Sequence, residues 1–307
     1  MNIVFMGTPD FAEESLRKLV ENNYNVVGVF TKPDMPVGRK HILTPPEVKV
    51  AAEELNIPVF QPNSLKNDES FNILKELNPD LIVVVAYGKI LPENILNLPK
   101  YGCINVHASL LPKYRGASPI QWSIVCGENE TGVSTMLLDK GMDTGDVLLS
   151  AATEIGSTET AEELWDRLKV MGGDLLIKTV EGLVSGSIKP IPQDEEKATY
   201  APIIKKSDGL IDWSKSAKEI DCKIRGLHSW PVAYTKVDEK MLKIFSADII
   251  DNIDDKFGKV ISSDKELVVA CGKGGLKINE LQLEGSKRMK TEDFLRGKKI
   301  TSEFLGE

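Results

Sequence analysis

The sequence lacks the features that mark secreted, membrane-spanning and zinc-binding proteins. Its four cysteines are widely separated and form no Cys-x-x-Cys pair, which argues against a disulfide framework and a zinc site. The longest uncharged apolar run, Leu81–Ala86, is far too short to cross a bilayer. No basic segment precedes the apolar residues at the N-terminus. We therefore expect a cytoplasmic protein with no signal peptide, no membrane segment and no bound metal.

A dinucleotide-binding fingerprint is missing as well. The first predicted strand, residues 2–6, is followed by a single glycine, Gly7, and not by Gly-x-Gly-x-x-Gly. The glycines of that fingerprint let the backbone approach a pyrophosphate closely. Its absence argues against an NAD-dependent dehydrogenase.

What the sequence does contain is the pattern of an α/β protein. Its 307 residues are 41% hydrophobic and 27% charged, which is typical of folded domains, and the length suffices for two. In the first part, short apolar runs alternate with segments whose apolar residues recur at helical spacing. This alternation predicts a Rossmann-like, doubly wound, mostly parallel sheet. We expect strands at 2–6, 26–30, 81–86, 103–108, 132–138 and 147–155, and helices at 46–55, 65–77 and 117–125.

Three sequence signals predict helix starts in this part. Thr8 is expected to cap the first helix, with Pro9 at its first position, and Ser64 to cap the helix at 65–77. Thr160 and Glu163 have the spacing of a capping box that opens a long amphipathic helix.

The composition and pattern of the sequence change after about Gly186. Prolines and a polar run predict a linker at 190–206 between a catalytic domain at 1–189 and a second domain at 207–307. The second domain has a helix at 216–227, followed by short strands separated by turn residues, which predicts a small OB-like β-barrel. The charge divides with it, since residues 205–307 carry a net charge of +2 and residues 1–204 a net charge of −10.

Polar residues stand at the end of one apolar strand. Asn105 and His107 are two residues apart, so both point to the same face of the strand. Ligands of open parallel sheets bind outside the carboxyl ends of the strands, which makes this pair a candidate site. A lone strand histidine is more often a hydrogen-bonded core residue, and this alternative stays open.

An acidic loop, Asp139–Asp146, follows the strand predicted at 132–138. Its three aspartates could mark a calcium loop or a plain surface turn, but the ligand spacing of an EF-hand is absent. If both strands lie in one sheet, Asp143 can reach His107.

These motifs together resemble those of the folate-dependent formyltransferases. The resemblance rests on Asn105–His107, Ser109–Pro112, Tyr114–Pro119 and Asp139–Asp146, and it extends over essentially the whole chain. It implies transfer of a formyl group from 10-formyltetrahydrofolate to an amine, with no metal. Asn105 and His107 would donate hydrogen bonds to the tetrahedral oxyanion, and Asp143 would orient His107 and help move the proton.

The resemblance also implies where the folate binds. The pterin would lie against two loops, and a neighbouring segment would form an adjoining wall. The loop residues are Ala86, Tyr87, Gly88, Ile90, Leu91, Pro92, Asp139, Gly141 and Met142, and the wall residues are Ser109, Leu110, Leu111 and Pro112.

Two features favour charged initiator transfer RNA as the acceptor. The long connection at 31–46 resembles an insertion loop of the family members that act on transfer RNA, with Arg39 and Lys40 as its expected contacts. The second feature is the predicted barrel, because small barrels often bind nucleic acids and this one ends in a basic stretch. The expected contacts there are Lys287, Arg288, Lys290, Arg296 and Lys298.

Other acceptors remain open at this stage. Related enzymes formylate glycinamide ribonucleotide or an amino sugar on a nucleotide, and the Asn–His–Asp set cannot separate these substrates. A non-catalytic RNA-binding protein is a further alternative. We expect a monomer.

Overall fold

The structure, a computed structural model, describes residues 1–38 and 41–306. The chain forms two compact units, each assembled from separate stretches of sequence. Unit 1 consists of Met1–Gly116, Thr131–Thr153 and Trp165–Tyr200. Unit 2 consists of Ala117–Glu130, Glu154–Leu164 and Ala201–Glu307.

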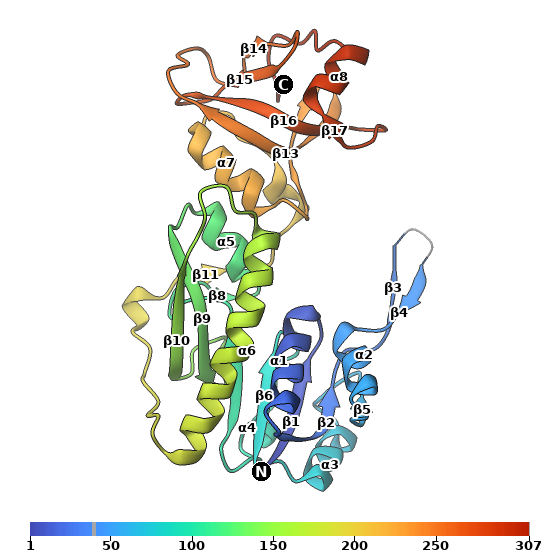
Figure 1. The fold of residues 1–307 in the computed structure, drawn as a ribbon, viewed down its shortest axis with the longest axis vertical. Helices are drawn as coiled ribbons and strands as arrows, with labels where there is room; N and C mark the ends of the chain where they lie inside the picture. The colour runs from blue at the N-terminus through green and yellow to red at the C-terminus, as the bar shows by residue number, and fades with distance from the viewer. Residues whose placement is uncertain (39–40, 307) are drawn as a thin grey trace. The chain divides into compact units, whose positions relative to one another are not determined.

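Unit 1 is built on a mostly parallel sheet, as predicted (Figure 1). In the described part of the chain this sheet has seven strands, in the order β10-β9-β7-β6-β1-β2-β5. The central pairs β1·β2, β1·β6, β6·β7 and β2·β5 are parallel, whereas β9 is antiparallel to β7. The strands are β1 (Asn2–Gly7), β2 (Asn25–Phe30), β5 (Val59–Phe60), β6 (Leu81–Val85), β7 (Cys103–His107), β9 (Glu130–Leu137) and β10 (Val147–Glu154).

Helices cover both faces of this sheet, which explains its continuous apolar strands. Alternate residues of β1 point to opposite faces; Val4 and Met6 join a core cluster with residues of two of the helices, α3 and α4. The helix α1 lies beside α6, and its Phe11 ring meets the Trp165 ring edge-on at 5.2 Å (Figure 1). The helices are α1 (Asp10–Glu21), α2 (Glu47–Glu54), α3 (Asp68–Leu77), α4 (Glu93–Leu96) and α6 (Ala161–Ser185).

One of the three predicted caps is present, and the other two predictions are wrong. Thr160 and Glu163 form the capping box, with 2.8 Å from Thr160 N to Glu163 Oε2. Thr8 does not cap α1; its hydroxyl donates to the Tyr87 carbonyl at the end of β6, 3.2 Å away. Ser64 does not cap the third helix, because the turn that follows Ser64 is not helical. This helix begins at Asp68 and is capped by Asn67.

The long connection at 31–46 contains a hairpin that the sequence analysis missed. The strands β3 (Met35–Val37) and β4 (Ile42–Thr44) pair antiparallel, and all of their residues are exposed. Three-residue strands are too short to show a period, so only the paired structure reveals them. In unit 1, η1 (Glu195–Lys197) is a single 3₁₀ turn. The short strand β8 (Arg115–Gly116) pairs with β11 (Tyr200–Ala201).

Unit 2 is a curled antiparallel sheet, a half-barrel that agrees with the predicted fold class. Its long strand β13 shifts register twice near Ser246, and such bulges let a strand bend. The helix α7 starts at the capping box Ser216–Glu219 and packs its Ile220 and Ile224 into the core of the sheet. The strands are β12 (Ala233–Val237), β13 (Lys240–Ile250), β14 (Val260–Ser262), β15 (Leu267–Ala270), β16 (Gly275–Leu283) and β17 (Met289–Lys290). The helical segments are α5 (Pro119–Val125), η2 (Lys206–Gly209), α7 (Ala217–Gly226) and α8 (Thr291–Gly297).

No helix among residues 1–38 and 41–306 combines the length and the apolar character that crossing a membrane requires. The domain boundaries expected from the sequence, 1–189, 190–206 and 207–307, stay a prediction.

Candidate active site at the end of strand β7

His107 is the last residue of β7, and its side chain is only 6% exposed. Its Nε2 lies 2.9 Å from the backbone carbonyl oxygen of Tyr114. A carbonyl oxygen can only accept a hydrogen bond, so Nε2 carries a hydrogen and donates it. The other ring nitrogen, Nδ1, is therefore the one that can interact with further groups in the site.

Asp143 lies in the loop between β9 and β10, and its Oδ2 is 3.7 Å from His107 Nδ1. The structure thus brings together the two residues that the sequence analysis paired. The same Oδ2 accepts a hydrogen bond of 2.8 Å from the backbone N–H of Gly116. Asp143 has a left-handed backbone with φ of 55°, which is unfavourable for a residue other than glycine. Such a conformation persists only where the surroundings enforce it.

Asn105 lies two residues before His107 on β7 and is half-buried. The strand pleat places both side chains on the same face. Among the described residues, no side chain or backbone group forms a hydrogen bond with the Asn105 amide. This amide is therefore available to a bound group.

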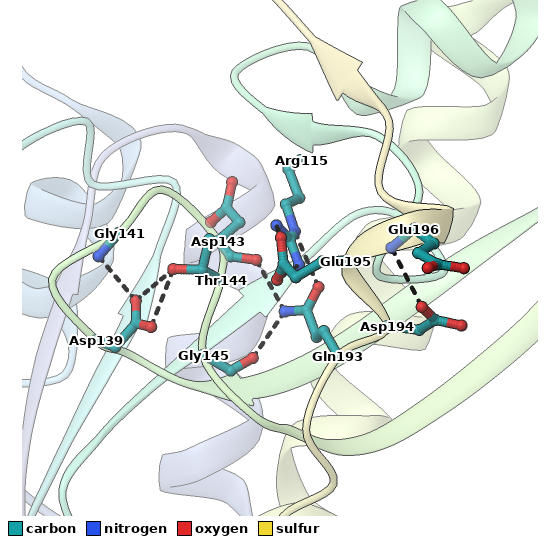
Figure 2. Close-up of polar contacts among 10 residues, drawn as sticks. All are labelled: Arg115, Asp139, Gly141, Asp143, Thr144, Gly145, Gln193, Asp194, Glu195 and Glu196. Carbon is teal, nitrogen blue, oxygen red and sulfur yellow. Dashed lines mark hydrogen bonds and ion pairs between the residues drawn. The ribbon is translucent and has the colours of Figure 1, made fainter.

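The loop around Asp143 closes on itself. The Asp139 carboxylate accepts hydrogen bonds from Gly141 N at 2.9 Å and from the Thr144 hydroxyl at 2.7 Å (Figure 2). Gly145 is packed so tightly that a methyl group there would come within 1.8 Å of the Leu137 carbonyl oxygen. Within the described part of the chain, no three His, Cys, Asp or Glu residues are grouped so that they could hold a metal.

The turn after β6 is the first of the predicted folate loops. Ala86 and Gly88 have left-handed backbones, with φ of 45° and 71°. Ala86, Gly88 and Ile90 are exposed, whereas Tyr87 and Leu91 belong to the core cluster beneath the sheet. Burial raises the pKa of Tyr87 to about 12. The exposed surface of this loop therefore consists of the backbone around Ala86 and Gly88 together with the Ile90 side chain, which is 79% exposed.

The other predicted folate residues lie on both sides of the β7 end. Ser109 is fully buried and its hydroxyl donates to the Lys113 carbonyl at 2.6 Å, so it supports the loop from inside. Leu110, Leu111 and Pro112 are half-buried, and Pro92 is as well. Met142 is 63% exposed, and Asp139 and Gly141 are exposed beside it.

Three functional candidates escaped the sequence analysis, and Figure 2 shows them around Asp143. Arg115 is fully buried and forms a two-bond ion pair with Glu195, with 2.7 and 2.9 Å between the atoms. The Arg115 Nε donates to Gln193 Oε1 at 3.0 Å. The Gln193 amide nitrogen in turn donates to the carbonyl oxygens of Asp143 and Gly145, at 2.8 and 2.7 Å. The position of Arg115 in the motif at 114–119 was a signal for its importance, but its partners lie in the predicted linker.

The Arg115–Glu195 pair changes the pKa of both groups. The hydrogen bond from Arg115 holds the pKa of the Glu195 carboxyl below its ordinary value. The hydrogen bond to Glu195 raises the pKa of the Arg115 guanidinium. Both groups are therefore charged at neutral pH, and the buried guanidinium has a partner.

The predicted RNA contacts are divided between two regions. Arg39 and Lys40 lie outside the described residues. The five residues on unit 2, Lys287, Arg288, Lys290, Arg296 and Lys298, are all exposed. Arg288 lies 4.1 Å from the centre of the Phe245 ring and pairs with Glu280, and Arg296 pairs with Glu292 and Asp293. Lys290 and Arg296 line a groove of about 940 Å³ on this unit.

Comparison with known proteins assigns the class. The family model for formyl transferases matches residues 1–180, and the model for their C-terminal domain matches residues 203–299. The chain therefore belongs to the formyl transferase family, whose members are enzymes that use folate. It is 51% identical to a protein named methionyl-tRNA formyltransferase from Clostridium novyi, over 99% of both chains. It is 50% identical to another of that name from Citrifermentans bemidjiense, over 98% of this chain and 94% of the other.

Solved structures share the fold at low sequence identity. A methionyl-tRNA formyltransferase from Clostridium thermocellum matches with a TM-score of 0.55 and 21% identity, over 81% of this chain and 93% of that one. An N-formyltransferase from Helicobacter canadensis, solved with folinic acid and dTDP-3-aminofucose, matches with a TM-score of 0.70 and 19% identity, over 94% and 99%. HypX from Aquifex aeolicus, solved with tetrahydrofolic acid, matches with a TM-score of 0.65 and 18% identity, over 95% and 46%.

Proposed function

We propose that this protein transfers the formyl group of 10-formyltetrahydrofolate to the amino group of methionyl-tRNA, giving the N-formylmethionyl initiator for translation. The observation that carries this proposal is the identity of about half of all residues, over nearly the whole chain, with proteins named methionyl-tRNA formyltransferase. Both units take part in this similarity, so it includes the second unit, where the predicted RNA contacts lie. We also propose that the enzyme acts as a monomer in the cytoplasm.

The chemistry follows from the three polar residues at the end of β7. The amine attacks the formyl carbon, the carbonyl oxygen becomes an oxyanion, and the bond from carbon to the folate nitrogen then breaks. The Asn105 amide, which is free of hydrogen bonds to the described part of the chain, can donate one to that oxyanion. Donors placed in advance where charge develops stabilise the transition state more than the substrate.

His107 supplies the second donor through Nδ1. Its Nε2 hydrogen already bonds to the Tyr114 carbonyl, so Nδ1 can donate only when the ring is protonated. The Asp143 carboxylate, 3.7 Å from Nδ1, stabilises that cationic ring. The amine loses a proton and the folate nitrogen gains one, and the His107–Asp143 pair carries it between them. No nucleophilic serine or cysteine is needed.

The folate is proposed to bind along the turn at 86–92 and the loop at 139–143, with residues 109–112 as an adjoining wall. The left-handed Ala86 and Gly88 turn the backbone of the first loop toward solvent, which suits recognition of a pterin by N–H and C=O groups. Because Tyr87 and Leu91 are buried, we assign them to the support of this loop. The acceptor RNA is proposed to contact Arg39 and Lys40 and the exposed basic residues of unit 2.

The proposal is tested by incubating the protein with 10-formyltetrahydrofolate and methionylated initiator tRNA, and measuring N-formylmethionine by mass spectrometry. Parallel reactions contain the uncharged RNA, glycinamide ribonucleotide, or a nucleotide-linked amino sugar. We expect formylation of the charged RNA alone. Formylation of a small amine and not of the RNA would show that the acceptor is wrong while the reaction class is right.

A further inference from the structure

We propose that Gln193 is a positioning residue for the reaction. Gln193 holds the backbone of Asp143 in place, and the buried Arg115 in turn holds Gln193. The inference rests on the proposed function, in which Asp143 acts together with His107. It assigns a role in the active site to a segment that the sequence presents as a linker.

The first step of the argument is the backbone conformation of Asp143. Its φ of 55° lies in the left-handed region, which residues with a Cβ atom adopt less readily than glycine. The side-chain carboxylate accepts a hydrogen bond from the backbone N–H of Gly116, at 2.8 Å. This bond holds the side chain. The Asp139 carboxylate binds Gly141 N and the Thr144 hydroxyl on either side of Asp143, and the Asp143 carbonyl is held by a further group.

Gln193 provides that hold. Its amide nitrogen has two hydrogens, and it donates to the carbonyl oxygens of both Asp143 and Gly145, the two residues that flank Thr144 (Figure 2). Two bonds of 2.8 and 2.7 Å from one nitrogen fix the distance between these carbonyls. They therefore fix the turn that points the Asp143 carboxylate toward His107.

Gln193 is itself oriented by Arg115. The amide oxygen of Gln193 accepts from Arg115 Nε at 3.0 Å, which determines which end of the amide faces the loop. Arg115 is fully buried and its other nitrogens are held by Glu195, so the guanidinium cannot turn. The backbone N–H of the next residue, Gly116, binds the Asp143 carboxylate. Residues of one short strand, β8, thus hold both parts of Asp143. Gly116 binds its side chain directly, and Arg115 holds its backbone through Gln193.

The segment that carries Gln193 is attached to unit 1 along its length. Ile191 pairs with Val147 through two backbone hydrogen bonds, both of 2.9 Å. Arg115 N donates to the Thr199 carbonyl, and Tyr114 N to the Thr199 hydroxyl, also at 2.9 Å. Tyr114 is the residue whose carbonyl holds His107. The segment from 191 to 199 thus supports both residues of the proposed catalytic pair.

The test uses Gln193→Glu, which keeps the shape and the acceptor for Arg115 but replaces the two donated hydrogens with an acceptor oxygen. We expect kcat for formyl transfer to fall about 10- to 100-fold, the range for a small misplacement of a catalytic group. The KM values for folate and for charged RNA should change less than kcat. Gln193→Ala, which adds no charge, should lower kcat in the same direction. The control is Asp255→Asn in unit 2, outside this segment, whose carboxylate pairs with a lysine four residues on, Lys259; its kcat should match the wild type.

The readout that distinguishes positioning from a structural role is a double-mutant cycle with Asp143→Asn. If Gln193 acts through Asp143, Gln193→Glu should lower kcat in the wild-type protein but hardly at all in the Asp143→Asn protein. An equal loss in both backgrounds, or unchanged kcat in both Gln193 variants, would overturn the inference. A wild-type protein without any formyl transfer would overturn the proposed function as well, so the two failures are distinguishable.

Discussion

His107 and Asp143 face each other with 3.7 Å between Nδ1 and Oδ2, although 35 residues separate them in the chain. The distance is too long for a direct hydrogen bond. The two groups are, however, close enough for a carboxylate to stabilise a protonated ring and for one bound group to form hydrogen bonds with both. Each side chain is held by a backbone group. The Tyr114 carbonyl accepts a hydrogen bond from His107, and the Gly116 N–H donates one to Asp143.

The first prediction concerns the oxyanion donors. Asn105→Ala and His107→Ala should each lower kcat by about 10²- to 10³-fold, the loss typical of one such donor. The dissociation constant for folate should change little, because the charge these donors stabilise is absent before attack. Steady-state kinetics and folate titration of each variant check this. A variant with wild-type kcat would remove its residue from the mechanism.

The second prediction concerns the packing of the Asp143 loop. Gly145→Ala places a methyl group 1.8 Å from the Leu137 carbonyl oxygen, which is backbone and cannot move aside. The loop must shift, so we expect a loss of kcat of at least about 10-fold and a stability loss of about 1–3 kcal/mol. The matched control is Gly297→Ala in α8, where a methyl group meets nothing within 4 Å. There, Ala should be neutral or stabilising by up to about 1 kcal/mol. Urea unfolding and kcat of both variants provide the comparison, and equal effects would contradict the assignment.

The third prediction concerns pH and the Arg115–Glu195 pair. The hydrogen bond from Arg115 lowers the pKa of the folded Glu195 carboxyl below its ordinary value of 4.5. A carboxyl with a depressed folded pKa contributes stability above its ordinary pKa, and this contribution is lost as the pH falls through the folded pKa. Glu195→Gln should therefore lower Tm at neutral pH, and the difference from wild type should shrink in acid below about pH 4. Glu196→Gln is the control, since its carboxylate has no partner among the described residues. A difference in Tm that grows on acidification would contradict the argument.

The fourth prediction concerns RNA binding by unit 2. Replacing Lys287, Lys290 and Lys298 together by Ala should weaken binding of charged RNA and make its dependence on salt shallower. Removal of one lysine–phosphate contact lowers the slope of log K against log salt by about one. The control replaces Lys66, Lys75 and Lys100, three exposed lysines of unit 1, and changes the net charge equally. If both triple variants show the same reduction in affinity and slope, the effect is one of net charge and the proposed contacts are wrong.

Much of the fold follows from local patterns in the sequence. The mainly apolar runs at 81–86 and 103–108 predict β6 and β7 within one residue, because most residues of a strand buried on both faces are apolar. The capping box at Thr160 also marks the start of α6, because its two partners are only three residues apart in the sequence. The hairpin of β3 and β4 was missed because each strand has only three residues.

The candidate site, like the fold, follows only in part from local patterns in the sequence. The shared strand face of Asn105 and His107 can be predicted from the sequence alone, because it depends only on the two-residue period of a strand. The sequence also singled out the loop of Asp143. The groups that hold these residues are visible only in the folded chain, because Gln193 lies 50 residues from Asp143 and Glu195 lies 80 residues from Arg115. A polar, proline-containing stretch has the composition of a linker whether or not it is bound. Only the folded chain brings a buried guanidinium beside it, and the need to pair that charge then fixes the segment in place.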